Sequence, residues 1–289
     1  MLFTPGNRLD MLAKAVTSGT DAVIVDLEDS VSLDNKPEAR GNLSNLPESP
    51  VPYYVRTNAV ETGLLWEDVI ASGQAPIVGV IIPKAEDPQV ISQIDGALTA
   101  LEMTSGKPHG SITVIPLIES GLGVRLTYEM AKASDRVECV MFGGGEQGDL
   151  VADLGVEWTP EGTGLMQARS QTLLSSRAAG VPYPMEAVFM DFRNPEGLRI
   201  ECELARTLGY VGKVAIHPGQ IPVINDVFTP STEVVEYQRK VLSAFEEAEA
   251  QGSASIAVDG KMVDYAVARV ARAIIARYEA ATRVSREGS

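Results

Sequence analysis

Two carboxylates lie where the sequence predicts a metal site. Glu119 closes a strongly apolar run, and Asp149 follows a glycine-rich turn further along the chain. Two carboxylates with room left for water or substrate form the oxygen-ligand site that Mg²⁺ prefers, whereas no cluster of His or Cys offers a site for a softer metal. The pattern therefore predicts Mg²⁺ as the cofactor. The alternative is that both acids form salt bridges at the edge of the fold.

Three more acids lie in the segment VDLEDSV, close to the end of another apolar run. Asp26 lies within the run, so its side chain points either into a barrel or toward a covering helix. Glu28 and Asp29 follow the run, and we expect them to orient metal-bound water or an arginine side chain. For Asp29 the alternative is that it caps the next helix.

Two cations also follow apolar runs. Arg56 ends YYVR, and its planar guanidinium suits a carboxylate or a developing enolate oxygen. It is also expected to pair with Glu28 or Asp29, and the two roles are compatible. Lys84 offers a point charge to a ligand, with a salt bridge at the rim as the alternative. His217 is interpreted either as a structural histidine or as a ligand contact.

Short apolar runs alternate with segments of helical period, which is typical of a parallel sheet covered by helices. Eight such units favour a (β/α)₈ TIM barrel, in which the polar residues after the strands meet at one mouth. The strands are expected at residues 2–3, 22–27, 53–56, 78–83, 112–118, 137–142, 187–190 and 214–217, and helices at 7–18, 64–72, 88–103, 165–179 and 195–208.

The chain is expected to have two domains, a catalytic barrel over residues 1–228 and a helical extension over 229–289. A capped helix start at Thr229 to Glu233 predicts a helix that runs to about Ala250, and a polar joint follows at 251–255. The segment after it is amphipathic and needs a surface to cover, either its own barrel or a neighbouring subunit.

The composition excludes several classes of protein. Among 289 residues, 45% are hydrophobic and 22% are charged, which is typical of a folded domain and not of a disordered chain. The net charge of −15 makes nucleic acid and anionic membrane surfaces unfavourable partners. Without an apolar span or a signal peptide, the chain is expected to be cytoplasmic. Cys139 and Cys202 are predicted to be small core residues in a reduced compartment.

In this order, the motifs resemble those of the citrate lyase β-subunit family, a part of the HpcH/HpaI aldolase superfamily that includes malyl-CoA and citramalyl-CoA lyases. The resemblance covers the whole chain. It is carried by LFTPGNR (2–8), AVIVDLEDSV (22–31), KPEAR (36–40), VRTN (55–58), PLIES (116–120), GDLVADLG (148–155), GKVAIHP (212–218), INDVFTPS (224–231) and DGKMVD (259–264). Because the chain begins at the first strand, a longer functional N-terminus is compatible with the family pattern.

The resemblance implies roles for these residues. Glu119 and Asp149 would be the Mg²⁺ ligands, and Arg56 would contact substrate oxygens. Asp264 would exchange a proton with the acyl carbon from a C-terminal lid, often over a neighbouring subunit, which suits a homo-oligomer such as a trimer or hexamer. The basic residues expected to contact the phosphates or pantetheine of a CoA or acyl-carrier thioester are Arg8, Lys14, Lys36 and Arg40, with Lys84 as a further cation.

The implied reaction is Mg²⁺-dependent cleavage, or condensation, of a short β-hydroxyacyl thioester such as citramalyl-CoA or malyl-CoA. One alternative is the β-subunit of a citrate lyase complex that cleaves citryl-acyl carrier protein to oxaloacetate and an acetyl thioester. Another is a hydroxyacyl-CoA thioesterase, and a scaffold without activity is the last. The chain departs from the family at two places. Many members carry an arginine shortly after the glutamate that corresponds to Glu119, where this chain has Gly121 to Gly123, and many carry a glutamate where this chain has Gly148.

Overall fold

The structure is a computed structural model that describes residues 1–159 and 161–287. By its internal contacts the chain divides into two units, Met1–Ile224 and Asn225–Ser289. The boundary lies within helix α10 (Ile221–Phe228), a few residues before the division expected from the sequence. Each unit is described by itself.

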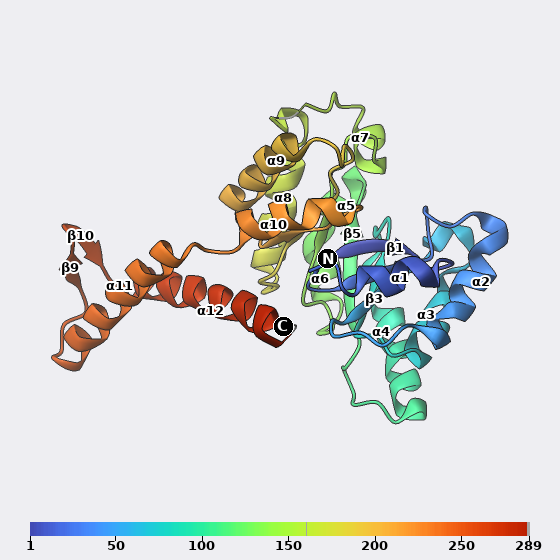
Figure 1. Ribbon diagram of the computed structural model, residues 1–289, viewed down its shortest axis with the longest axis horizontal. Helices are drawn as coiled ribbons and strands as arrows, with labels where there is room; N and C mark the ends of the chain where they lie inside the picture. The colour runs from blue at the N-terminus through green and yellow to red at the C-terminus, as the bar shows by residue number, and fades with distance from the viewer. Residues whose placement is uncertain (160, 288–289) are drawn as a thin grey trace. The chain divides into compact units, whose positions relative to one another are not determined.

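Over residues 1–159 and 161–224, the first unit is built on eight parallel strands that follow one another in chain order. Figure 1 shows helices around these strands. A parallel bridge joins Leu2 to Ala215, and the N–H of Phe3 donates to the carbonyl of Ala215 at 2.9 Å, so the first strand also meets the segment after the last one. The predicted α/β class with eight parallel strands is confirmed. The strands are β1 (Leu2–Pro5), β2 (Val23–Asp26), β3 (Tyr53–Arg56), β4 (Gly79–Ile82), β5 (Thr113–Ile118), β6 (Met141–Gly143), β7 (Met185–Ala187) and β8 (Gly212–Lys213).

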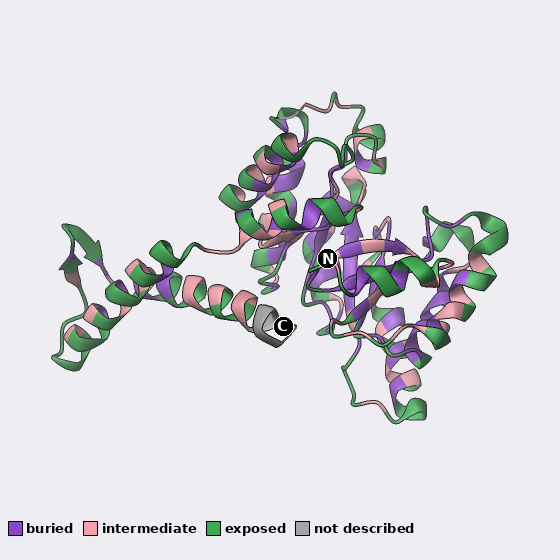
Figure 2. Ribbon diagram, viewed as in Figure 1, coloured by how far each residue is buried: buried purple, intermediate pink, exposed green. Residues whose placement is uncertain are grey.

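The strands are buried on both faces, as their continuous apolar runs predict. All four residues of β2 and of β4 are buried, and the buried residues of Figure 2 concentrate on the sheet. Side chains from alternate positions form a central cluster that includes Ile24, Ile81, Leu117, Met141 and Val214. Cys139 and Cys202 are both buried free thiols, in agreement with the prediction.

Helices follow most of the strands, and the five predicted helices are confirmed to within a few residues at each end. Side chains of Asp87, Ser120 and Asn194 accept hydrogen bonds at the starts of three helices, two of them predicted from the sequence. The helices of this unit are α1 (Leu9–Ala15), α2 (Lys36–Gly41), α3 (Leu65–Gln74), α4 (Pro88–Ser105), α5 (Gly121–Arg125), α6 (Thr127–Lys132), α7 (Asp149–Leu154), α8 (Met166–Ala178), α9 (Pro195–Leu208) and α10.

The last two strands lie two residues earlier than predicted. Their paired residues include Glu186 and Lys213, whose charged side chains are buried between the sheet and the helices α8 and α9. Lys213 Nζ lies 2.8 Å from Glu186 Oε2, and Arg169 bonds both Glu186 and Glu201. A search for apolar runs places these two strands too late in the sequence, because it leaves out the buried charged residues that belong to them.

The second unit consists of two helices and a hairpin, α11 (Thr232–Ala250), β9 (Ile256–Val258), β10 (Lys261–Val263) and α12 (Tyr265–Glu287). Ser231 caps α11, and the predicted end at Ala250 is confirmed. Val241, Phe245, Val258 and Val263 form its core. The hairpin was not predicted. Among the residues that the structure describes, no helix is long and apolar enough to cross a membrane.

Candidate functional site

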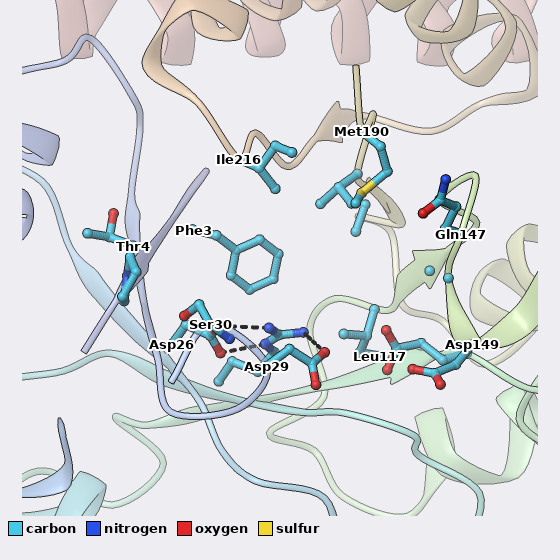
Figure 3. Close-up of a pocket in the computed structure, with 18 of the residues that line it drawn as sticks. Phe3, Thr4, Asp26, Asp29, Ser30, Leu117, Gln147, Asp149, Met190 and Ile216 are labelled. Carbon is cyan, nitrogen blue, oxygen red and sulfur yellow. Dashed lines mark hydrogen bonds and ion pairs between the residues drawn. The ribbon is translucent and has the colours of Figure 1, made fainter. Parts of the chain in front are cut away.

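A cavity of about 520 Å³ opens at the carboxyl ends of the strands of the first unit. Figure 3 shows Met190 and Ile216 across this cavity from Asp26, Asp29 and Asp149. The cavity therefore has an apolar side and a charged side. Its lining includes Phe3, Asp26, Asp29, Ser30, Arg56, Leu117, Glu119, Gly143, Gly145, Gln147, Asp149, Val188, Met190 and Ile216.

The two predicted metal ligands both line this cavity. Glu119 directly follows β5, and Asp149 is the first residue of α7. Burial raises the pKa of Glu119 to about 7, with Arg56 opposing the shift and the Asp149 carboxylate adding to it. At Gly143 a Cβ atom would lie 2.5 Å from Glu119 Cγ, so the end of β6 must be glycine for the glutamate to sit there.

Arg56, the last residue of β3, is held by three acids at the end of β2 and just after it. Its Nε and NH2 donate to the two carboxylate oxygens of Asp26 at 2.7 and 2.8 Å. Its NH1 lies 3.0 Å from Glu28 Oε2 and 3.5 Å from Asp29 Oδ2. The guanidinium also lies over the Phe3 ring, 4.6 Å from its centre. The side chain of Asp26 therefore points toward Arg56 and the cavity, and not toward a covering helix.

The electrostatics of this group follow from burial and pairing. Burial alone would raise the pKa of Asp26, but the charge and hydrogen bonds of Arg56 lower it below its usual value. Burial raises the pKa of Glu28 to about 8, although Arg56 partly offsets it. Burial would lower the pKa of Arg56, but Asp26 and Glu28 raise it further above its usual value. The guanidinium thus stays charged and is fixed in one orientation.

The four basic residues expected near a thioester carrier have different surroundings. Lys36 donates to the carbonyls of residues 27 and 28 and to the Asn58 side chain, so its ammonium holds the loop after β2. Arg40 pairs with Asp68 and Glu67. Neither set of internal partners is evident from the sequence. Arg8 forms an exposed pair with Asp10, and Lys14 is exposed in the last turn of α1.

Asp264 lies in the second unit and is not among the residues that line the cavity. Its Oδ1 accepts hydrogen bonds from the N–H groups of Ala266 and Val267 at the start of α12. The side chain of His217 is held by its own surroundings: its Nδ1 accepts a hydrogen bond from the backbone N–H of Gly219, and its ring stacks on Phe192.

Several lining residues were not singled out from the sequence. Gln147 and Met190 belong to no motif named from the sequence and reach the cavity only through the folding of the loops. The extra glycines of the loop after β6 were a signal, because at Gly145 a Cβ atom would lie 3.3 Å from the carbonyl of Val188. That contact shows how closely this loop approaches the end of β7.

The donor set suits a hard divalent ion such as Mg²⁺ and not a soft metal. Within the described residues, no three His, Cys, Asp or Glu side chains are grouped as a metal site. Glu119 and Asp149 are two hard oxygen donors that face one cavity, and their mutual repulsion helps to raise the pKa of Glu119. Mg²⁺ commonly takes one or two carboxylates and completes its shell with water or substrate.

The resemblance seen in the sequence is confirmed by comparison with known proteins. Residues 1–218 match the family model described as HpcH/HpaI aldolase/citrate lyase. Citrate lyase subunit beta of Leuconostoc mesenteroides subsp. cremoris is 32% identical over 100% of this chain and 96% of its own. L-malyl-CoA/beta-methylmalyl-CoA lyase of Rhodobacter capsulatus is 32% identical over 97% of this chain and 94% of its own.

Solved structures give the same result. The CitE protein of Mycobacterium tuberculosis, in complex with magnesium, acetoacetate and coenzyme A, superimposes with a TM-score of 0.76 at 32% identity. The match covers 96% of this chain and 97% of that one. A second structure of that protein, with magnesium and pyruvate, matches 80% of this chain with a TM-score of 0.66 and 33% identity.

Proposed function

The chain belongs to the HpcH/HpaI aldolase/citrate lyase family, and we propose that it cleaves or condenses a short β-hydroxyacyl thioester such as malyl-CoA or citramalyl-CoA. It is a magnesium-dependent carbon–carbon lyase, because its full-length relatives are lyases and its structural neighbours hold magnesium with small acids or coenzyme A. One observation of the structure carries the proposal: Arg56 at the end of β3, Glu119 after β5 and Asp149 at the start of α7 line the same cavity.

Glu119 and Asp149 would hold the magnesium ion, which supplies Lewis-acid polarisation of the substrate's hydroxyl and carboxylate oxygens when it is bound. Arg56 binds the thioester oxygen, where negative charge develops as the carbon–carbon bond breaks. Because Asp26 fixes Arg56 on two donors, the remaining NH1 is oriented before the substrate arrives. Transfer of the hydroxyl proton to water in the cavity would start cleavage, and the electrons of the breaking carbon–carbon bond would pass to the acyl carbon as a thioester enolate. The products are a keto acid and, once this enolate is protonated, a shorter acyl thioester.

Asp264 completes the proposed reaction. Its carboxylate would protonate the acyl carbon of the thioester enolate and, in the reverse direction, remove that proton. This role requires the second unit to act as a lid, and we propose that it covers the site of a neighbouring subunit in a trimer or hexamer. The lid would close over the mouth of a (β/α)₈ barrel. The Leu2–Ala215 bridge supports the closure of the strands into such a barrel.

The thioester carrier would lie along the basic residues near the first two strands. Arg8 and Lys14 are exposed and remain the better candidates for phosphate contacts, with Lys84 nearer the carboxylates. Lys36 and Arg40 would act on the carrier only indirectly, through the loop they hold. We propose that the reaction takes place in the cytoplasm.

A second candidate is the β-subunit of a citrate lyase complex, which would act on a citryl group carried by an acyl carrier protein. Full-length identity to citrate lyase subunit beta supports it as strongly as identity to malyl-CoA lyase supports the first. A thioesterase would use the same cavity with water as the attacking group. These candidates differ in their products and in their need for partners.

Product analysis tests the proposal. The purified protein is incubated with malyl-, citramalyl- and citryl-CoA, with Mg²⁺ or EDTA, and carbon products are identified by mass spectrometry. A keto acid with a shorter acyl-CoA, formed only with Mg²⁺, is the expected result. Free CoA with an intact hydroxy acid would replace the lyase by a thioesterase. Turnover only of citryl-acyl carrier protein, with an added α-subunit, would favour the complex.

A further inference from the structure

Lys84 contacts both carboxylates of the proposed magnesium site. It follows β4, and its backbone N–H donates to Glu119 Oε2 at 3.1 Å. Its side-chain Nζ lies 3.3 Å from Asp149 Oδ2. One residue from a third strand therefore bridges the two acids, through the backbone on one side and the ammonium on the other.

The backbone of Lys84 has an unusual conformation. Its φ of 47° lies in the left-handed region, and in the described part of the chain the other non-glycine residue there is Asp259, in the turn of the β9–β10 hairpin. With this conformation two successive N–H groups face the end of β5, since Ala85 donates to the carbonyl of Leu117 at 3.1 Å. Glycine would adopt the conformation at lower cost, so the strained lysine indicates that its side chain contributes to the site.

The two contacts differ in strength. Lys84 and Asp149 are 37% and 51% exposed, so water and salt weaken their ion pair and a divalent cation can displace it. Glu119 is half-buried, and its bond to the backbone of Lys84 does not require the ammonium to stay in place. A metal ion can therefore take over the charge of the ammonium while Glu119 keeps its orientation.

On the basis of the proposed magnesium site, we propose that Lys84 is an exchangeable counter-ion of that site. In the metal-free protein its ammonium offsets the repulsion between Glu119 and Asp149 and keeps both acids in place. When the metal binds, the ammonium leaves Asp149 while the backbone N–H continues to orient Glu119. Lys84 is thus a positioning residue that prepares the site and weakens its affinity for the metal.

Calorimetric titration of the metal-free protein with MgCl₂ tests this role. Lys84→Met removes the charge with little change in length, and it is expected to tighten the Kd for Mg²⁺ about threefold or more, because the ion no longer competes with the ammonium. The same variant is expected to have a lower Tm than the wild type in EDTA, since the two acids lose their counter-ion. Lys84→Arg keeps the charge and should remain within about twofold of the wild-type Kd.

Lys240→Met is the matched control, since it removes an equal charge from an exposed ion pair with Asp259 in the second unit. It should leave the affinity for Mg²⁺ unchanged. Unchanged or weaker Mg²⁺ binding by folded Lys84→Met would overturn the counter-ion role while leaving the lyase assignment intact. Absence of Mg²⁺ binding by the wild type and all three variants would overturn both this role and the magnesium site.

Discussion

At the scale of single residues, the site depends on how buried charges are compensated. Arg56 is surrounded by three acids, and each has a different part in holding it. Asp26 takes two of its donors, whereas Glu28 and Asp29 share NH1. A guanidinium held in this way can meet a developing oxyanion without reorganising, which is the source of most electrostatic catalysis.

The first prediction concerns the Asp26–Arg56 pair. Asp26→Ala leaves a buried guanidinium short of a partner, and the free energy of unfolding should fall by about 3 kcal/mol. Denaturant unfolding measures the change. The matched control is Asp10→Ala, which breaks an exposed pair with Arg8 and should have a far smaller effect. Equal effects of the two substitutions would contradict the structural importance of the buried pair.

The second prediction concerns pH. The pKa of Glu119 is raised to about 7 and that of Glu28 to about 8, both mainly by burial, so the folded metal-free protein binds protons more tightly than the unfolded chain. This contribution to stability is complete below the ordinary pKa of about 4.5 and is lost as the pH rises to about 8. Urea unfolding in EDTA should therefore show decreasing stability from pH 5 to pH 8.

Glu119→Gln is the informative variant for this pH dependence. Its stability should fall less over the same range, because only Glu28 continues to lose protons. A wild-type stability that is constant or rises between pH 5 and pH 8 would contradict the burial of these two carboxyl groups.

At the scale of secondary structure, the ends of β3, β4, β5 and β6 bring the charged groups together. The apolar runs that precede Arg56, Lys84 and Glu119 are clear in the sequence, and parallel strands end at the same edge, so their convergence was predictable. The direction of the Asp26 side chain was not predictable, because a residue inside a strand faces either the barrel interior or the covering helices, depending on the register. The partners of Lys36 were equally hidden, since they are backbone carbonyls of a loop.

The errors in the predicted elements also have physical reasons. β7 and β8 contain Glu186 and Lys213, which pair with each other away from water, so the apolar runs that predicted these strands begin only after the charged residues. The β9–β10 hairpin carries the Asp-Gly pair that favours tight turns with two left-handed residues, and both Asp259 and Gly260 have positive φ. That signal was present, but the polar stretch before it favoured interpretation as a flexible joint.

The third prediction tests the contact between β6 and Glu119. Gly143→Ala places a methyl group 2.5 Å from Glu119 Cγ, so the glutamate must move. The affinity for Mg²⁺, measured by titration calorimetry, should fall about tenfold or more, equivalent to about 1.4 kcal/mol.

Gly96→Ala in α4 is the control for this substitution, because no neighbouring atom lies within 4 Å of the added methyl group. It should leave Mg²⁺ binding unchanged and stabilise the helix by about 0.5–1 kcal/mol. Wild-type metal affinity in Gly143→Ala would show that Glu119 is not a ligand.

At the scale of the whole molecule, the proposed reaction requires two units of the chain. The proposed metal ligands and Arg56 belong to Met1–Ile224, whereas Asp264 belongs to Asn225–Ser289. If the lid of one subunit serves the cavity of another, each active site combines residues from two chains. Such a site can be rebuilt from two different inactive variants.

The fourth prediction follows from this sharing. Glu119→Ala and Asp264→Asn should each abolish most lyase activity as separate proteins. Co-expression of the two variants should restore part of the activity, since an Asp264→Asn cavity can receive an intact lid from a Glu119→Ala subunit. Activity is measured as keto acid formation by the purified mixed oligomers. Absence of any recovery in confirmed mixed oligomers would show that the lid acts within its own chain.

The central claim is that Glu119 and Asp149 hold the catalytic magnesium ion beside Arg56. A crystal structure of the protein with Mn²⁺ in place of Mg²⁺ and with a 2-oxo acid tests it most directly, because Mn²⁺ is located by its anomalous scattering. We predict one strong metal peak coordinated by both carboxylates, with the oxo acid bound to the metal and close to Arg56. A metal peak elsewhere, or an oxo acid bound in the cavity without metal, would contradict the claim.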